Sequence, residues 1–155
     1  AAAGVDGVLT VDLPPEEADE LVSALQAQDI DEIFLLAPTS GAERMERISQ
    51  SASGFVYYVS FKGVTGANRL DVDAVAGKLE EIRQHTDLPV GVGFGIRDAR
   101  SAAQVAAVAD AVVVGSVLVS QIAEHSSQPE KIAPALAATV AELRAGIDAA
   151  QLAGA

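Results

Sequence analysis

The chain has 155 residues, half of them hydrophobic, so it can bury a sizeable core and is expected to form one domain over residues 1–155. Its net charge of −12 argues against binding nucleic acid or an anionic membrane, since both depend on clustered Lys and Arg. The lack of cysteine excludes disulfides, thiolate catalysis and cysteine-bound metals. Neither a signal peptide nor a membrane-spanning stretch is predicted, and we expect a cytoplasmic protein.

Short apolar runs rich in β-branched residues alternate with helical stretches along the chain. The runs predict strands at residues 7–11, 32–36, 55–59, 90–94 and 111–114. Helices are predicted at about residues 15–28, 42–52, 71–86, 98–108, 117–125 and 130–147, and Gly4 is expected to end a preceding helix. This alternation predicts right-handed crossovers and a parallel sheet with both faces covered.

Two α/β architectures fit this order of elements. About five β/α units do not close an eight-stranded barrel, and five open strands would expose edges and an apolar inner face. A flavodoxin-like open sheet fits the length but does not explain a helix that ends at Gly4. The elements therefore fit an incomplete barrel better, with strands that are missing or supplied by a partner.

Two glycine-rich turns follow the last two predicted strands. They are Gly93-Phe94-Gly95-Ile96 and Val114-Gly115-Ser116, and each opens a helix. In barrels of this class the last two strand-to-helix loops commonly bind phosphate, because backbone N–H groups and a helix N-terminus converge there. Glycine lets the backbone approach the anion closely. The pair of turns predicts a phosphate site.

The segment Lys62-Gly63-Val64-Thr65-Gly66 follows the strand that ends at Ser60. Its glycines can act as hinges, and a loop that closes here would exclude water while Thr65 adds a hydroxyl. An ordinary flexible βα loop explains the same residues equally well.

Asp12 and Tyr57 each have a structural and a functional interpretation. Asp12 follows the first strand and could orient a substrate or a lid, although the run 12–17, with its prolines and acids, favours a helix start. Tyr57 shares a strand face with Phe55 and Val59, where core packing is the usual role and an aromatic pocket is the alternative.

Several other polar residues are assigned structural roles. Asp6 and Asp110 each precede a strand and are interpreted as turn residues. His85 and His125 lie near helix ends, where a cation suits the helix dipole, and neither has a metal-ligand pattern nearby. No metal site and no nucleophilic serine are predicted.

Taken in order, these motifs resemble the C-terminal half or more of the tryptophan synthase alpha chain family. The resemblance rests on motifs spread over nearly the whole chain: Val8-Leu9-Thr10-Val11-Asp12-Leu13-Pro14, Ile33-Phe34-Leu35-Leu36-Ala37-Pro38, Tyr57-Tyr58-Val59-Ser60, Gly63-Val64-Thr65-Gly66, Gly93-Phe94-Gly95-Ile96 and Gly115-Ser116. It implies an α/β fold, the C-terminal portion of a (β/α)8 TIM barrel, of which this chain supplies about five β/α units, strands four to eight. It also implies retro-aldol cleavage of indole-3-glycerol phosphate to indole and glyceraldehyde 3-phosphate.

The resemblance assigns roles to particular residues. The substrate phosphate would be held by Gly66, Gly95, Gly115 and Ser116. Leu9 and Phe94 would contact the indole ring, Tyr57 would line the pocket, and Thr65 would belong to the closing loop. Asp12 would organise the lid and the subunit interface rather than transfer a proton.

The family's main acid/base glutamate and the aspartate that binds the indole nitrogen lie on early strands that this sequence does not contain. Loss of a general acid/base typically costs on the order of 10²- to 10⁴-fold in rate, so we expect the chain alone to be inactive or nearly so. The implied partners are the missing N-terminal half of the barrel and a tryptophan synthase beta subunit, itself PLP-dependent, met by the loops around Pro14 and Pro38. No cofactor is expected for this chain.

Two other functions remain open at this stage. A phosphosugar isomerase or epimerase could use a related phosphate-binding barrel, but it would need further carboxylates or metal ligands at strand ends. A noncatalytic half-barrel could instead associate through its exposed sheet edges and bind phosphate incidentally.

Overall fold

A computed structural model describes residues 2–60, 71–93 and 95–154. The strands are β1 (Gly7–Leu9), β2 (Asp31–Ile33), β3 (Leu35–Leu36), β4 (Val56–Val59), β5 (Val90–Gly93) and β6 (Ala111–Val113). The helices are α1 (Asp19–Gln26), α2 (Ala42–Ser51), α3 (Val72–Arg83), α4 (Ala99–Ala106), α5 (Ser116–Glu124) and α6 (Ile132–Gly154). Two 3₁₀ turns, η1 (Pro15–Glu17) and η2 (Pro129–Lys131), precede α1 and α6.

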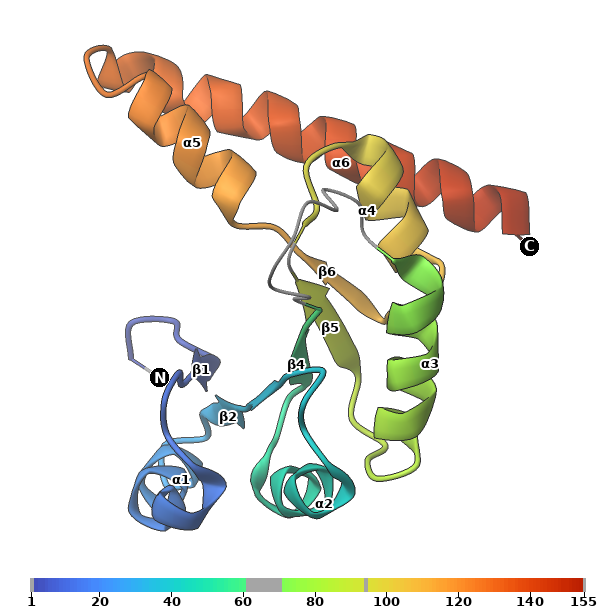
Figure 1. The fold of residues 1–155 in the computed structure, drawn as a ribbon. Coiled ribbons are helices and arrows are strands. Elements are labelled where there is room, and N and C mark those ends of the chain that lie inside the picture. The colour runs from blue at the N-terminus through green and yellow to red at the C-terminus, as the bar shows by residue number, and fades with distance from the viewer. Residues whose placement is uncertain (1, 61–70, 94, 155) are drawn as a thin grey trace.

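Every paired strand is parallel to its neighbour, as the alternation of elements predicts. β1 pairs with β2, and β3, β4, β5 and β6 follow in sequence order in a second ladder. The helices that connect successive strands pass along the outside of this curved series (Figure 1). Parallel strands in sequence order with helices outside them are the arrangement of a (β/α) barrel. All carboxyl ends of the strands therefore lie at one edge.

The single strand predicted over residues 32–36 is wrong, because the segment is divided at Phe34. β2 pairs backward with β1, and β3 pairs forward with β4. Phe34 is 1% exposed, and its carbonyl accepts a hydrogen bond from Tyr57 N at 3.0 Å, so the residue joins the two ladders. A continuous apolar run carries no signal for such a division.

The hydrophobic core lies between the outer face of the strands and the helices. Alternation along β4 and β5 sends Val56, Tyr58, Val90 and Val92 to this side, and all four are at most 3% exposed. The helices contribute Met45, Ile48, Val75, Leu79, Ile82, Ala102, Val105 and Leu143 to the same cluster. Each large apolar side chain buried there stabilises the fold by about 1.5–3 kcal/mol.

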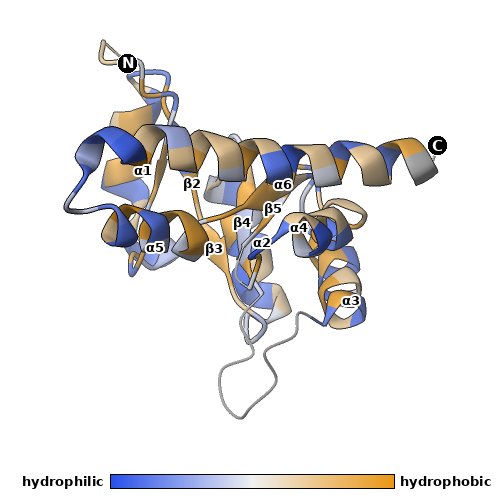
Figure 2. Ribbon diagram, turned by 90° about the horizontal axis from the view of Figure 1, so that it is seen from above, coloured by the Kyte–Doolittle hydropathy of each residue, from blue (hydrophilic) through white to orange (hydrophobic). Residues whose placement is uncertain are grey.

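The ends of the chain differ from the sequence prediction. Residues 2–4 form a turn and a bend rather than a helical turn, although Gly4 has the left-handed φ of +79° expected after a helix. Helix α6 is longer than predicted and reaches Gly154, crossing over α5 and α4 (Figure 2). Within the described ranges, no helix is long and apolar enough to cross a membrane.

Candidate functional site

The two glycine turns lie side by side at the carboxyl edge, because they follow the paired strands β5 and β6. Gly95 has φ +77° and turns the chain out of β5. Asp98 then caps α4, accepting a hydrogen bond from Ser101 N at 2.8 Å, while Ser101 Oγ accepts one from Asp98 N at 3.1 Å. The Ser101 N–H lowers the pKa of the Asp98 carboxyl. The start of α4 is thereby fixed beside the turn.

The second turn places backbone donors at the start of α5. Gly115 is the N-cap residue and offers no side chain, and Leu118 N makes the first intrahelical bond, to Gly115 O at 3.0 Å. The N–H groups of Ser116 and Val117 precede that bond, so the helix leaves them free for an external acceptor. Such donors, together with the helix dipole, favour an anion.

Tyr57 lies on the inner face of the sheet, directly over β5. A methyl group on Gly93 would stand 2.6 Å from Tyr57 Cζ, and one on Gly91 would stand 3.2 Å from Phe55 Cε2. The two aromatic rings thus occupy space that these glycines leave open, beside the turn at Gly95. Burial raises the pKa of the Tyr57 hydroxyl, which keeps it protonated at neutral pH.

Ser60 joins the ends of β4 and β5, a role that the sequence did not reveal. Its Oγ donates to Gly93 O at 3.0 Å, and its backbone N donates to the same oxygen at 3.1 Å. The predicted absence of a nucleophilic role for Ser60 remains a prediction. Its contacts give it a structural role at the edge where the candidate site lies.

Asp12 does not cap the following helix, so the favoured interpretation is wrong. The first helical turn, η1, has Pro14 at its N-cap with no side-chain hydrogen bond. Asp12 has φ +65° and is exposed, and its carboxylate has no hydrogen-bond donor in the described part of the chain. The reason is that the two prolines begin the turn by fixing φ, without a side-chain acceptor. Asp12 thus lies exposed, three residues after the carboxyl end of β1.

The remaining predicted residues divide into two groups. Leu9 ends β1 at the same edge and is 41% exposed, opposite Ile33 in the register. Thr65, Gly66 and Phe94 lie outside the described residues, so their roles stay predictions.

Lys78 is a second residue that the sequence analysis missed. Its ammonium group on α3 donates to Ser40 O and to Glu81 Oε2, both at 2.8 Å, and its side chain is only 13% exposed. Ser40 Oγ in turn accepts from Ala37 N at 3.0 Å. These bonds hold the loop after β3 at the carboxyl edge. The Lys78–Glu81 spacing signals only a surface ion pair.

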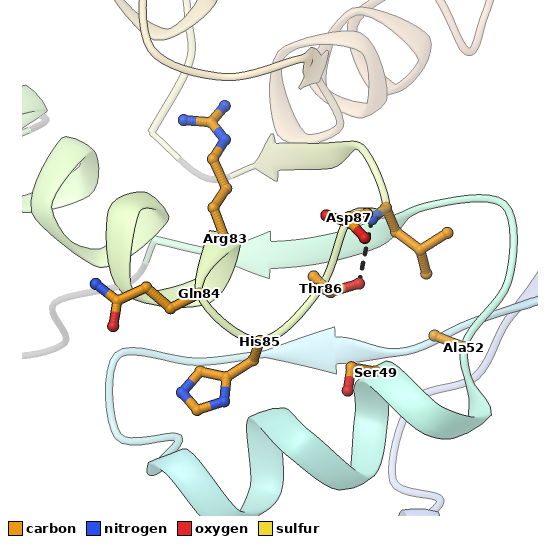
Figure 3. Close-up of a pocket in the computed structure, with 8 residues that line it drawn as sticks. Ser49, Ala52, Arg83, Gln84, His85, Thr86 and Asp87 are labelled. Carbon is orange, nitrogen blue, oxygen red and sulfur yellow. Dashed lines mark hydrogen bonds between the residues drawn. The ribbon is translucent and has the colours of Figure 1, made fainter.

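An open groove lies at the opposite, amino-terminal edge, between the ends of α2 and α3 (Figure 3). Three of its polar side chains already have partners: Ser49 Oγ donates to Glu46 O at 2.7 Å, Thr86 Oγ1 accepts from Leu88 N at 3.2 Å, and Arg83 donates to Asp110 at 3.2 Å. The side chains of Arg83, Gln84 and His85 point in different directions (Figure 3). They do not converge on a ligand.

These features define the C-terminal half of a (β/α)8 barrel, with its candidate site at the carboxyl edge where barrel enzymes of this class bind substrates. The family model for the tryptophan synthase alpha chain matches residues 1–148. The chain belongs to the tryptophan synthase alpha chain family.

Relatives and solved structures agree with this assignment. The chain is 64% identical over 148 residues to the tryptophan synthase alpha chain of Thioalkalivibrio sulfidiphilus, covering 96% of this chain and 56% of the relative. It is 57% identical over 151 residues to that of Nitrosococcus oceani, covering 97% and 56%. The crystal structure of the alpha subunit from Legionella pneumophila superposes with a TM-score of 0.83 at 38% identity, covering 95% of this chain and 53% of that one. The chain therefore spans about half the length of the relatives it matches, and the half is the C-terminal one.

Proposed function

We propose that this chain is the substrate-binding half of a lyase that cleaves indole-3-glycerol phosphate to indole and glyceraldehyde 3-phosphate in cytoplasmic tryptophan biosynthesis. The observation that carries the proposal is the pair of turns at Gly95 and Gly115-Ser116 on adjacent strands, in a chain 64% identical to a tryptophan synthase alpha chain. The comparisons do not favour an isomerase or epimerase.

The phosphate is held at the two turns, because backbone N–H groups bind an anion without needing a basic side chain. That matters in a chain with a net charge of −12. The indole ring lies on the inner face of the sheet, against Tyr57 and Leu9. Gly66 and Phe94 complete the contacts, and the loop that carries Thr65 closes over the substrate.

Cleavage needs a proton delivered to indole C3 and a proton removed from a glycerol hydroxyl. Asp12 is exposed beside the substrate edge and serves the lid and a partner subunit, not proton transfer. The main acid and base belong to the early strands of a complete barrel. The chain by itself therefore binds the phosphate end of the substrate and cleaves it at least about 10²- to 10⁴-fold more slowly than a complete alpha chain.

Two partners complete the activity. One is the N-terminal half of the barrel, which pairs with the free edges of β1 and β6 and covers the inner face of the sheet. The other is a tryptophan synthase beta subunit, which contacts the loops around Pro14 and Pro38. Val11 near the first loop is 63% exposed, which supports a partner on this side.

Indole release tests the proposal directly. The purified chain is assayed with indole-3-glycerol phosphate alone, and again after refolding together with the N-terminal half of the Thioalkalivibrio sulfidiphilus alpha chain. We expect no release alone and recovery in the mixture. A matched pair, Ser116→Asp and Ser120→Asp, locates the phosphate, because only the first charge lies at the start of α5. Robust release by the chain alone would contradict the division of roles, and no release from a folded mixture would contradict the reaction.

A further inference from the structure

Helix α6 packs against both helices that follow the glycine turns. It lies along α4, which begins after the Gly95 turn, and against α5, which begins at Ser116 (Figure 2). The buried and half-buried residues of α6 recur every three or four positions and include Ile132, Leu136, Thr139, Leu143, Gly146 and Ile147. This spacing places them on one stripe of the helix. One face of one helix thus contacts the two helices that begin at the candidate site.

The contact with α4 depends on Gly146. A methyl group at this position would stand 2.7 Å from the carbonyl oxygen of Ala99 and 2.8 Å from its Cβ. Ala99 is the first residue of α4 and directly follows the capping residue Asp98. Leu143, one turn earlier on α6, is 5% exposed. The missing side chain at Gly146 therefore sets how close the start of α4 lies to α6.

The contact with α5 includes a partly buried hydrogen bond. Gln121 Nε2 donates to Thr139 Oγ1 at 2.6 Å. The other amide atom, Gln121 Oε1, is buried and has no hydrogen-bond partner in the described ranges. A buried amide oxygen without a hydrogen-bond partner already destabilises the fold. Loss of the Nε2 bond to Thr139 would add a second unpaired group to the same side chain. The bond ties α5 to the same stripe of α6 that carries Gly146.

We propose that α6 is a brace that sets the separation of the two glycine turns, with Gly146 and Thr139 as positioning residues for the phosphate. The inference rests on the proposed function, since it concerns the same site. An anion shared by two turns must lie within hydrogen-bond distance of both, about 2.7–3.2 Å. A shift of about 1 Å at either helix start therefore weakens binding at a site that neither Gly146 nor Thr139 touches.

The test compares Gly146→Ala with Gly77→Ala. Both replace a helical glycine with alanine and raise helix propensity, but Gly77 in α3 has open space around it. Two readouts are used on the full chain: the Kd for inorganic phosphate, and the backbone amide NMR signals of Gly95, Ala99, Gly115 and Ser116 without ligand. We expect Gly146→Ala to weaken phosphate binding on the order of tenfold and to shift these signals, and Gly77→Ala to change neither.

A second variant keeps the test decisive if Gly146→Ala does not fold. Thr139→Val keeps the shape of the side chain but removes the bond to Gln121, so it should shift the Ser116 signal and weaken phosphate binding. If Gly146 and Thr139 have a purely structural role, their variants will unfold earlier, but the folded chains will keep the Kd and the four amide signals of the parent. That result would overturn the proposal that α6 is a brace. If the parent chain binds no phosphate, the proposed function fails at this site, while the amide signals still decide whether α6 positions the turns.

Discussion

The ring of Tyr57 lies against the α-carbon of Gly93, so that one residue of β4 fills the space left by the missing side chain of its neighbour on β5. Gly93 lies two residues beyond the register partner of Tyr57, since Tyr57 pairs with Gly91 and Val59 pairs with Gly93. The ring therefore leans along the strand toward the carboxyl edge, beside the turn at Gly95. Gly93 has two roles: it starts the turn and it makes room for the aromatic side chain.

This contact predicts that Gly93→Ala is destabilising and that the loss depends on Tyr57. The new methyl group would overlap the phenol, first at its hydroxyl oxygen and then at Cζ, which is 2.6 Å away, and overpacking of this kind typically costs about 1–3 kcal/mol. Gly91→Ala is the matched control, because its nearest contact, Phe55 Cε2 at 3.2 Å, is milder. Urea unfolding of both variants and of Tyr57→Ala/Gly93→Ala measures the coupling. Equal losses for Gly93→Ala with and without Tyr57 would contradict it.

The two tyrosines should ionise above the usual pKa of tyrosine. Burial raises the pKa of Tyr57, and burial followed by the charge of Glu81 raises that of Tyr58. Because the folded-state pKa values are raised, the folded chain holds these two protons more tightly than the unfolded chain does. The stability that this difference adds is complete below the unfolded pKa of about 10 and is lost as the pH rises through the folded values. An ultraviolet titration of tyrosinate in the parent chain, Tyr57→Phe and Tyr58→Phe assigns each step. A tyrosine that titrates at its ordinary pKa in the folded chain would count against this environment.

Much of the architecture could be predicted from the sequence, because it depends on local patterns. Apolar β-branched runs, the capping residue Asp98 and the helix that begins near Ser116 are signals within a few residues of one another. The division of the predicted strand at Phe34 is different, because it depends on which neighbour each half pairs with. Register of that kind is a tertiary property.

The candidate site was predictable in part for the same reason. The glycine turns can be recognised from their local composition. The contacts of Tyr57 with Gly93 and of Gly146 with Ala99 cannot, because they join residues far apart along the chain. For Asp12 the local pattern was misleading. An acid beside two prolines indicates a helix cap, but the first helical turn here has Pro14 at its N-cap and no side-chain hydrogen bond. Sequence patterns locate a turn better than they identify its contacts.

Asp110 should contribute to stability through its carboxylate, in contrast to Asp6. Both residues precede a strand, but Asp110 Oδ2 accepts hydrogen bonds from Val90 N at 2.8 Å and from Arg83 at 3.2 Å. The Val90 N–H, and then Arg83, lower the pKa of Asp110. Its side chain is 45% exposed, so we expect a loss of only about 1 kcal/mol for Asp110→Asn and less than about 0.5 kcal/mol for Asp6→Asn.

The pH dependence of the free energy of unfolding tests whether the Asp110 carboxylate is the cause of this loss. A carboxyl whose folded pKa is lowered adds stability that is present above its unfolded pKa and is lost as the pH falls through the folded value. The difference between the parent chain and Asp110→Asn, measured by urea unfolding, should thus persist at neutral pH and shrink in acid, below the ordinary aspartate pKa of about 3.9. A difference that does not change with pH would assign the loss to packing.

The buried Glu32 and the half-buried Thr10 form a polar pair whose removal should not weaken the fold. Glu32 is 2% exposed; Thr10 Oγ1 donates to its Oε1, while Oε2 has no hydrogen-bond partner among the described residues. Thr10→Val alone leaves the carboxylate without this donor and should cost about 1–3 kcal/mol. Glu32→Leu and the double variant should be as stable as the parent chain or more stable, because an apolar side chain needs no partner. Urea unfolding of all three decides, and a Glu32→Leu variant clearly less stable than the parent would refute this account.

The start of α5 provides the sharpest test of anion binding, because two effects of one substitution have opposite signs there. Ser116→Asp places a negative charge at the first residue of the helix, which favours the helix dipole by about 0.3–1 kcal/mol. The same charge repels a phosphate bound at these N–H groups and should raise the Kd for inorganic phosphate at least about tenfold. Ser120→Asp, one turn along α5 and exposed, should leave the Kd nearly unchanged. A calorimetric titration gives the Kd of each variant, and a thermal unfolding curve gives its stability. If the Kd rises in a variant that unfolds at no lower temperature than the parent, the loss lies in the binding site and not in the fold. Equal phosphate binding by both variants would place the anion away from α5 and leave the Gly95 turn to hold it alone.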